Sequence, residues 1–480
     1  MSATPVAAPA AAGVARGGAA NLAGAAFAGL AGFGVTWLAA RALGPVQAGG
    51  FFAATAAFTL AGTVAKLGTP TGLVYFLARL RARDASATAL RQCVRTGVVP
   101  VAAASVVAAA VLWFAAAPAY ATQSRVLAVF LPVAVLCDTL LAATRGWRRM
   151  RPTVMLDRLL RPALQLVLLG LLALSAVRAP AAYPLAWALP YVPAAALAGI
   201  ALRRLVPAAA GRNDFRAGAF WRFTGPRALA SVAQLAIGRV DVLLLAALAG
   251  LRAAAMYAVA SRFLVFGQMV NQALLLAVQP RLAELLGTKD RAGASTLYRT
   301  ATAWLILAVW PVYLGTAVFA SVYLGLFGSG YRAGTAVVVV LAAAMLVATG
   351  CGTVDTVLAM AGRTSWNLAN VLLALTVNVT VDLALIPHLG PLGAAVGLAA
   401  ATLTNNLVPL AQIATALRLH PFGRTTFAAA LTALGCFGAV PVAVAAVMGT
   451  TLPAALVAIV LGGSGYAVAL RRVLRLDAIG

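Results

Sequence analysis

Arginine residues fall in every second gap between the apolar stretches of this 480-residue chain, and that alternation limits its fold more than any other feature. A bilayer core about 30 Å thick requires about 20 apolar residues for each helix that crosses it. The chain offers about fourteen such runs, and only 10% of its residues are charged, against about a quarter in soluble domains. The sequence therefore predicts an all-α polytopic membrane protein.

The orientation of these spans follows from where the basic residues lie. If the N-terminus is cytoplasmic, 28 of the 36 Lys and Arg residues lie in cytoplasmic segments, and five lie outside: Arg41, Arg125, Arg178, Arg252 and Arg332. Such an excess of positive charge in short cytoplasmic loops orients membrane proteins. An even number of spans then places both termini in the cytoplasm. The predicted spans are residues 20–40, 47–78, 92–114, 124–145, 158–177, 183–202, 224–250, 254–280, 300–326, 333–361, 365–387, 391–417, 426–447 and 451–470.

The net charge of +26 does not indicate a nucleic-acid-binding protein, because such a domain gathers its charge on one solvated face. Here the arginines lie at membrane edges, where they favour anionic lipid headgroups. The four cysteines are scattered through spans and the two histidines stand alone, so we expect no metal site, no cofactor and no disulfide framework. No nucleophile–base–acid set can be assembled, and we expect no enzyme.

Composition and spans together predict the domain organisation. Residues 1–19 are rich in Ala, Pro and Gly, and we expect a disordered cytoplasmic tail there rather than a cleaved signal peptide. Residues 20–203 form a first six-helix lobe, and residues 204–223 form a basic cytoplasmic loop. Residues 224–418 form a second six-helix lobe, and residues 419–480 hold two further helices with a short tail.

A weak internal repeat supports the two lobes. Gly44 to Ala54, between the first two spans, matches Gly250 to Ala260 at one offset of 206 residues. Asp138-Thr-Leu-Leu-Ala matches Asp355-Thr-Val-Leu-Ala. Six spans separate the members of each match, so both members run in the same direction. This repeat implies lobes related by an axis along the membrane normal, an arrangement found in transporters.

Ionisable residues within spans are costly, by roughly 2.5–3.5 kcal/mol, and usually face protein or water. The candidates here are Lys66, Asp138, Arg239, Asp241, Arg262, Asp355 and Asp382. Arg239 and Arg262 lie at similar depth in adjacent antiparallel spans. Together with Arg41 and Lys66 they would form a cationic ladder suited to an anionic headgroup. We therefore predict that Arg41, Lys66, Arg239 and Arg262 bind substrate.

The acidic residues have structural alternatives. Asp241 would pair with Arg239 or Arg262 and join two helices, or serve as a coupling group. Asp138 and Asp355 lie near the cytoplasmic edge, close to Arg145 and Arg363, and we favour structural ion pairs for them over a coupling role. Lys66 would alternatively extend to the cytoplasmic interface. Asp382 lies near the outer end of its span, and we expect it at the interface.

Several motifs in order resemble the polysaccharide-export branch of the multidrug/oligosaccharidyl-lipid/polysaccharide (MOP) flippase superfamily, and the likeness covers nearly the whole chain. They are Ala40-Arg-Ala-Leu-Gly-Pro with Phe51-Phe-Ala-Ala, Leu67-Gly-Thr-Pro-Thr-Gly-Leu73, Arg239-Val-Asp241 with Met256-Tyr-Ala-Val-Ala-Ser-Arg262, Gln279-Pro-Arg-Leu-Ala-Glu284, Gly325-Leu-Phe-Gly-Ser-Gly-Tyr331, and Leu385-Ile-Pro-His-Leu-Gly-Pro-Leu-Gly-Ala-Ala-Val396.

The resemblance implies two six-helix lobes, often with two extra helices, and a central cavity near the first two spans of each lobe. It implies that the chain moves a polyprenyl-pyrophosphate-linked oligosaccharide across the bacterial inner membrane by alternating access, for cell-surface polysaccharide synthesis. Lipid-linked oligosaccharide, membrane lipids and other polysaccharide-assembly proteins would be its partners. Arg239, Asp241 and Arg262 match cavity positions.

Rival functions remain open at this point. A cation-coupled drug exporter of the same superfamily would need an acidic, desolvated coupling site within a lobe, and no acidic cluster is visible in the sequence. A lipid II flippase is a second rival. A membrane-embedded polysaccharide polymerase or ligase would need a large extracytoplasmic loop carrying Arg or His, and no outside loop exceeds about a dozen residues.

Overall fold

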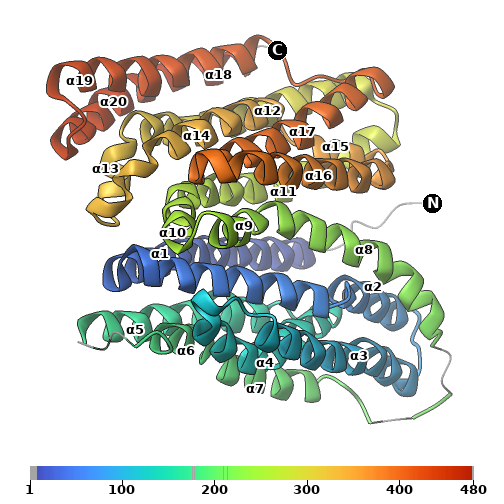
Figure 1. Ribbon diagram of the computed structural model, residues 1–480. Helices are drawn as coiled ribbons and strands as arrows, with labels where there is room; N and C mark the ends of the chain where they lie inside the picture. Colours follow the sequence, from blue (N-terminus) through green and yellow to red (C-terminus); the bar gives the residue numbers. More distant parts are fainter. Residues whose placement is uncertain (1–7, 176, 178, 209, 213–214, 478–480) are drawn as a thin grey trace. The chain divides into compact units, whose positions relative to one another are not determined.

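The computed structural model describes residues 8–175, 177, 179–208, 210–212 and 215–477, and every regular element in these ranges is a helix (Figure 1). Contacts divide the chain into two compact units. Unit 1 extends to Ala42 and resumes over Ala54–Leu235, whereas unit 2 consists of Leu43–Ala53 and the chain from Ala236 onward.

The helices that begin before the unit boundary are α1 (Ala8–Ala65), α2 (Thr69–Ala82), α3 (Ala87–Phe114), η1 (Pro118–Tyr120), α4 (Ala121–Gly146), the π-helix η2 (Thr153–Leu160), α5 (Arg161–Leu174), α6 (Ala182–Ala188), α7 (Tyr191–Arg203) and α8 (Ala217–Ile237). Unit 2 continues with α9 (Val240–Leu248), α10 (Leu251–Ala260), η3 (Ser261–Phe263), α11 (Leu264–Gly287), α12 (Arg291–Val318), α13 (Ala320–Gly325), η4 (Ser329–Gly334), α14 (Thr335–Gly350), α15 (Val354–Met360), α16 (Thr364–Leu389), α17 (Pro391–Ala416), α18 (Arg424–Leu434), the π-helix η5 (Gly435–Ala439), α19 (Val440–Met448) and α20 (Leu452–Asp477).

The predicted fold class is confirmed, although the count of fourteen spans is not. Eleven helices of the described residues are long and apolar enough to cross a membrane, or twelve if the bent pair α8–α9 is one span. Predicted spans 20–40 and 47–78 fall within one helical segment, Asn21–Ala82. Predicted span 158–177 divides between the π-helix η2 and the 14-residue α5, which is too short to cross alone.

Gly44 interrupts α1 with a non-helical conformation, φ 71° and ψ 172°. Gly250, its predicted equivalent, has nearly the same conformation, φ 87° and ψ 169°. A side chain is strained in this region of the backbone map, so glycine is required at both positions. The break at Gly44 lets the chain turn between two apolar runs. Gly49, just after it, lies so close to the backbone of Leu251 in unit 2 that no Cβ would fit.

Unit 1 is built around α4, which packs against α2, α3 and α7. Leu127 and Leu131 of α4 are fully buried in a cluster with Phe58 and Tyr191. The helix α2 also lies very close to α8, because a Cβ at Gly68 would stand 2.6 Å from the carbonyl oxygen of Thr224. This close contact explains why most of α8 belongs to unit 1.

Unit 2 has a comparable centre in α12, which packs against α11, α14 and α18. Tyr298 on α12 is buried, and its hydroxyl donates to the carbonyl of Cys351 at 2.6 Å. The hairpin of α16 and α17 supplies the largest single helix pair, and Gly393 allows its close approach to Leu385. The last helices, α18 to α20, pack with one another and with α12 (Figure 1).

Two predicted boundaries differ from the structure. The helix α1 begins at Ala8, inside the segment predicted to be a disordered tail, because its Ala-rich sequence has high helix propensity; residues 1–7 lie outside the described residues. The unit boundary falls after Leu235, within predicted span 224–250, rather than in loop 204–223. The last turns of that predicted loop already belong to α8, which begins at Ala217.

Candidate functional site

The first charged site lies within unit 1, where α1 ends at Ala65 and α2 begins at Thr69. Leu67 and Gly68 both have positive φ, 51° and 70°, so the chain turns sharply here. The turn places Lys66 at a helix end, and its Nζ lies 3.0 Å from Oδ2 of Asp138 on α4.

A second ion pair stands on the π-helix η2, which interrupts the regular helix before α5. Nη2 of Arg161 lies 2.5 Å from Oδ1 of Asp157, and Nη1 donates to the hydroxyl of Tyr191 at 2.7 Å. The guanidinium of Arg161 also lies over the ring of Tyr191, 4.8 Å from its centroid. π-Helical turns are rare and occur frequently at functional sites.

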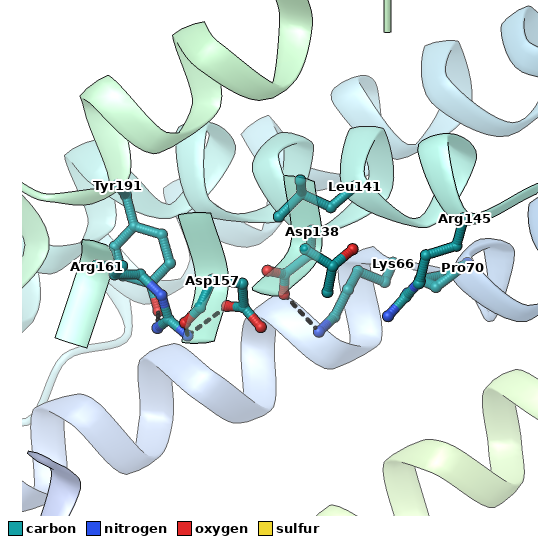
Figure 2. A pocket seen from close by; sticks show the side chains of 9 residues that line it. Lys66, Pro70, Asp138, Leu141, Arg145, Asp157, Arg161 and Tyr191 are labelled. Carbon is teal, nitrogen blue, oxygen red and sulfur yellow. Dashed lines mark hydrogen bonds and ion pairs between the residues drawn. The ribbon is translucent and has the colours of Figure 1, made fainter. Parts of the chain in front are cut away.

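These groups enclose a cavity of about 300 Å³, which we call the unit 1 pocket (Figure 2). It carries three cations, of Lys66, Arg145 and Arg161, and two carboxylates, of Asp138 and Asp157. Figure 2 shows the side chain of Arg145 beside that of Lys66. The guanidinium of Arg145 forms no ion pair or hydrogen bond with any residue in the described ranges. The full lining is Lys66, Pro70, Asp138, Leu141, Arg145, Thr153, Asp157, Arg161 and Tyr191.

The second charged site lies within unit 2 and centres on Asp241, in the first turn of α9. Asp241 is 1% exposed, and its carboxylate accepts a hydrogen bond from the hydroxyl of Tyr257 on α10. Asp382 on α16, which is 0% exposed, lies beside Asp241 and accepts from Nδ2 of Asn378 at 3.4 Å. We call Asp241 and Asp382 the acid pair.

The acid pair is a desolvated acidic site of the kind that a coupling cation requires. One oxygen each of Asp241, Asn378 and Asp382 is buried without a hydrogen-bond donor among the described residues. Adjacent carboxylates cannot both remain charged in a buried site unless a proton or cation balances them. Oxygen atoms of carboxylates and amides are the ligands that hard cations prefer. A Cβ at Gly397 would collide with Asp382, so glycine keeps this site open.

Two arginines of unit 2 stand apart from these carboxylates, and we call them the arginine pair. Arg239 precedes α9 and Arg262 lies in η3, and the two are close enough for their charges to repel each other. Neither guanidinium forms an ion pair or hydrogen bond within the described part of the chain. Nε of Arg262 is buried without a partner. The alternative in which Asp241 pairs with Arg239 or Arg262 is not observed among the described residues; the carboxylate of Asp241 accepts from Tyr257 and lies beside Asp382.

The structure brings together some predicted site residues and separates others by unit. Arg239, Asp241 and Arg262 belong to unit 2, whereas Lys66 and Asp138 belong to unit 1. Arg41 also belongs to unit 1, where its guanidinium lies over Trp37 at 5.6 Å from the ring centroid. The ladder that would join all four cations stays a prediction.

The expected partners of the remaining acids differ from those observed. Asp138 pairs with Lys66 instead of Arg145, and Asp355 pairs with no basic residue within the described ranges, since Arg363 lies over Trp366 instead. Asp382, which was expected at the interface, is fully buried in the protein beside Asp241. Sequence reasoning also missed the roles of Arg161 and Asn378. Their signals were the four-residue spacings Asp157–Arg161 and Asn378–Asp382, which put each pair on one helix face.

Comparison with known protein families decides the identification. Residues 14–286, more than half of the chain, match the family described as polysaccharide biosynthesis protein. The chain belongs to this family. No curated protein matches it by sequence.

Three solved structures have the same fold as this chain. The structure of lipid II flippase MurJ in an inward closed conformation superposes on this chain with a TM-score of 0.72 at 12% identity, covering 95% of this chain and 99% of that one. An inward-facing multidrug resistance MATE transporter of the MOP superfamily gives 0.60 at 14% identity, covering 82% and 96%. A MOP superfamily transporter from Pyrococcus furiosus gives 0.55 at 15% identity, covering 84% and 96%. The chain therefore shares the fold of these transporters, two of which are described as MOP superfamily members, and the predicted likeness is confirmed at the level of family and fold.

Proposed function

We propose that this family member is a flippase that moves a polyprenyl-pyrophosphate-linked oligosaccharide across the bacterial inner membrane by alternating access, for cell-surface polysaccharide synthesis. The observation that carries the proposal is the arginine pair: two guanidiniums that interact electrostatically and have no carboxylate partner in the described residues. Membership of the polysaccharide biosynthesis family supports the choice of a sugar-linked lipid.

The arginine pair answers the main energetic obstacle to such transport. A pyrophosphate carries two or more negative charges, and moving an isolated ion into a low-dielectric medium costs tens of kcal/mol by Born solvation. Fixed positive groups in a wet cavity lower that cost. Guanidinium groups bind phosphate oxygens through two parallel hydrogen bonds, which a lysine cannot do. Nε of Arg262 has no hydrogen-bond partner, and neither guanidinium forms an ion pair, among the described residues.

The decisive experiment replaces each arginine by alanine in a strain that lacks its native flippase. Arg239→Ala or Arg262→Ala should stop export while the protein still folds and inserts, and arginine-to-lysine variants should restore export only in part. Lipid-linked oligosaccharide is measured on each membrane face. Arg252→Ala, at an exposed arginine of α10 in the same unit, is the matched control and should export normally. Parental export by both alanine variants at normal expression would overturn the proposal.

A cation-coupled exporter is the second candidate, and the acid pair is the specific observation that favours it. A drug exporter of this superfamily would need a desolvated acidic site, and Asp241 with Asp382 provides one. Asp382→Asn should then abolish drug resistance in cells while the arginine variants leave it intact. If the arginine variants lose oligosaccharide export and drug resistance never depends on this protein, the exporter is ruled out. Rescue of cells depleted of their lipid II flippase would instead assign lipid II as substrate.

The proposed localisation is the inner membrane with both termini cytoplasmic, as the arginine distribution predicts. Epitope tags fused to each end should resist protease added to intact spheroplasts and become sensitive after lysis. Cleavage of either tag in intact spheroplasts would exclude this topology. Lipid-linked oligosaccharide, membrane lipids and other polysaccharide-assembly proteins are the partners that the proposal implies.

A further inference from the structure

We propose that the unit 1 pocket is a second anion site, which binds a phosphate group through Lys66, Arg145, Thr153 and Arg161. The site stands on unit 1 residues alone and does not depend on the arginine pair of unit 2. Its ligand would be either free phosphate or the phosphate headgroup of a polyprenyl lipid, since both present the same tetrahedral oxyanion.

Charge favours an anion over a cation in this pocket. Three cationic side chains face two carboxylates, so the side chains of the pocket carry an excess positive charge. Each carboxylate already accepts from a cation, because Asp138 is paired with Lys66 at 3.0 Å and Asp157 with Arg161 at 2.5 Å. An entering cation would have to displace one of these pairs. An entering anion would meet the unpaired guanidinium of Arg145.

The unused hydrogen-bonding capacity of the pocket also points to an anion. Thr153 is 3% exposed, and its Oγ1 has no hydrogen-bond partner in the described residues. Nε of Arg161 is likewise buried without a partner, although its other two nitrogens are engaged. Arg145 adds a full set of N–H groups. These atoms can all donate, and the arginine nitrogens can only donate, so the complementary ligand is rich in acceptors, as a phosphate is.

The local backbone explains how these donors come to one place. The π-helix η2 carries Thr153 and Asp157, and α5 begins directly after it with Arg161. All three residues line the pocket with Arg145 from the last turn of α4. The pocket volume of about 300 Å³ is at the lower end of the usual range for small-molecule sites, about 300–1,000 Å³. That size suits a headgroup rather than a whole oligosaccharide.

The test is calorimetric titration of the purified full-length protein in detergent with inorganic phosphate, at constant ionic strength set with chloride. Loss of one charge-assisted hydrogen-bond donor should make Arg145→Gln bind phosphate about tenfold more weakly. Arg125→Gln, in the same helix but exposed and outside the pocket, is the matched control and should bind as the parent does. Asp138→Asn should bind more tightly, because it removes a negative charge and releases Lys66.

Asp138→Asn is expected to raise the phosphate affinity, whereas a misfolded variant would bind phosphate more weakly. This variant therefore separates a change in the pocket from misfolding. Equal phosphate affinity in the parent, Arg145→Gln and Asp138→Asn would overturn the proposal, and so would binding that chloride abolishes. Titration with a short-chain prenyl monophosphate then identifies the source. Binding at least tenfold tighter than phosphate, and weakened by Arg145→Gln, supports a lipid headgroup; equal binding of both probes supports free phosphate. Loss of export in the Arg239 and Arg262 variants tests the flippase proposal separately.

Discussion

The two units use the same few charged residue types in opposite ways. In unit 1, Lys66 pairs with Asp138 and Arg161 pairs with Asp157, so most charges in the pocket are neutralised in place. In unit 2, like charges are grouped instead: Arg239 lies near Arg262, and Asp241 lies near Asp382. Opposite charges that form an ion pair balance each other within the fold. Like charges that lie near each other leave a net field, which a ligand of opposite charge would balance.

This contrast indicates which charged groups could contribute free energy to ligand binding. A buried charge without a partner lowers stability, and the ligand that satisfies it recovers that free energy on binding. Under the proposed function, an anion would satisfy the arginine pair of unit 2, and a cation or proton would satisfy the acid pair. In the unit 1 pocket, the guanidinium of Arg145 has no ion-pair partner among the described residues and lies beside two closed pairs. The following substitutions test how the pairing of charges in each unit affects export and stability.

The largest effect on export is expected when an ion pair like those of unit 1 is introduced at the arginine pair of unit 2. Arg262→Glu places a carboxylate beside Arg239, and the new ion pair would occupy the donors meant for phosphate. Loss of two charge-assisted hydrogen bonds, roughly 1.5 kcal/mol each at the least, corresponds to a fall in export of about 100-fold. Export is measured as lipid-linked oligosaccharide on the outer face of the membrane.

Stability should move in the other direction for this variant, because a repulsive pair becomes an attractive one. The apparent Tm in detergent should equal or exceed that of the parent. Arg252→Glu makes the same charge change at an exposed position of α10 and should alter neither quantity. Normal export by Arg262→Glu would show that separated charge in unit 2 has no part in transport.

The next effect concerns the backbone at the two glycines that the internal repeat makes equivalent. Gly44→Ala and Gly250→Ala each force a side chain into a conformation with positive φ, and each should cost about 1–3 kcal/mol. Gly170→Ala in α5, where a Cβ would meet no atom within 4 Å, should instead raise stability by about 0.5–1 kcal/mol. Thermal unfolding in detergent ranks the three. A much smaller loss of stability for one of these two glycine variants than for the other would contradict the equivalence of Gly44 and Gly250.

Much of this fold could be predicted from the sequence because bilayer thickness sets the length of each apolar run. The break after Lys66 was visible as Gly68 and Pro70 within an apolar span, and the turn at Gly44 coincides with the start of the repeat. The π-helix at Thr153 was not predictable, because its extra residue per turn leaves no distinct hydrophobic period. Predicted span 158–177 therefore did not reveal that its first turns belong to an irregular helix.

The candidate sites were predicted less completely, since pairing depends on which helices face each other. The arginines of unit 2 stood out because they are rare within spans. Their lack of a partner could not be read from the chain, because Asp241 is two residues from Arg239 and its true neighbour Asp382 lies more than a hundred residues later. Arg161 was counted among the basic residues of the cytoplasmic segments and Asp157 was not considered, so the pocket that they line was missed.

The smallest effect is expected where unit 1 loses a closed pair. Lys66→Met leaves Asp138 without its cation, and breaking a fully buried pair costs about 3–5 kcal/mol. Because the side chains of Lys66 and Asp138 are 24% and 37% exposed, solvent screens the loss, and we expect about 1–2 kcal/mol. The double variant Lys66→Met with Asp138→Leu should recover most of this loss of stability, since neither charge of the pair remains.

Arg281→Met breaks the more exposed pair with Glu284, whose side chains are 65% and 63% exposed, and should cost under about 0.5 kcal/mol. A loss at Lys66 no larger than that at Arg281, measured by thermal unfolding, would mean that the pair in unit 1 is as weak as a surface pair, and the contrast between the two units would then rest on unit 2 alone.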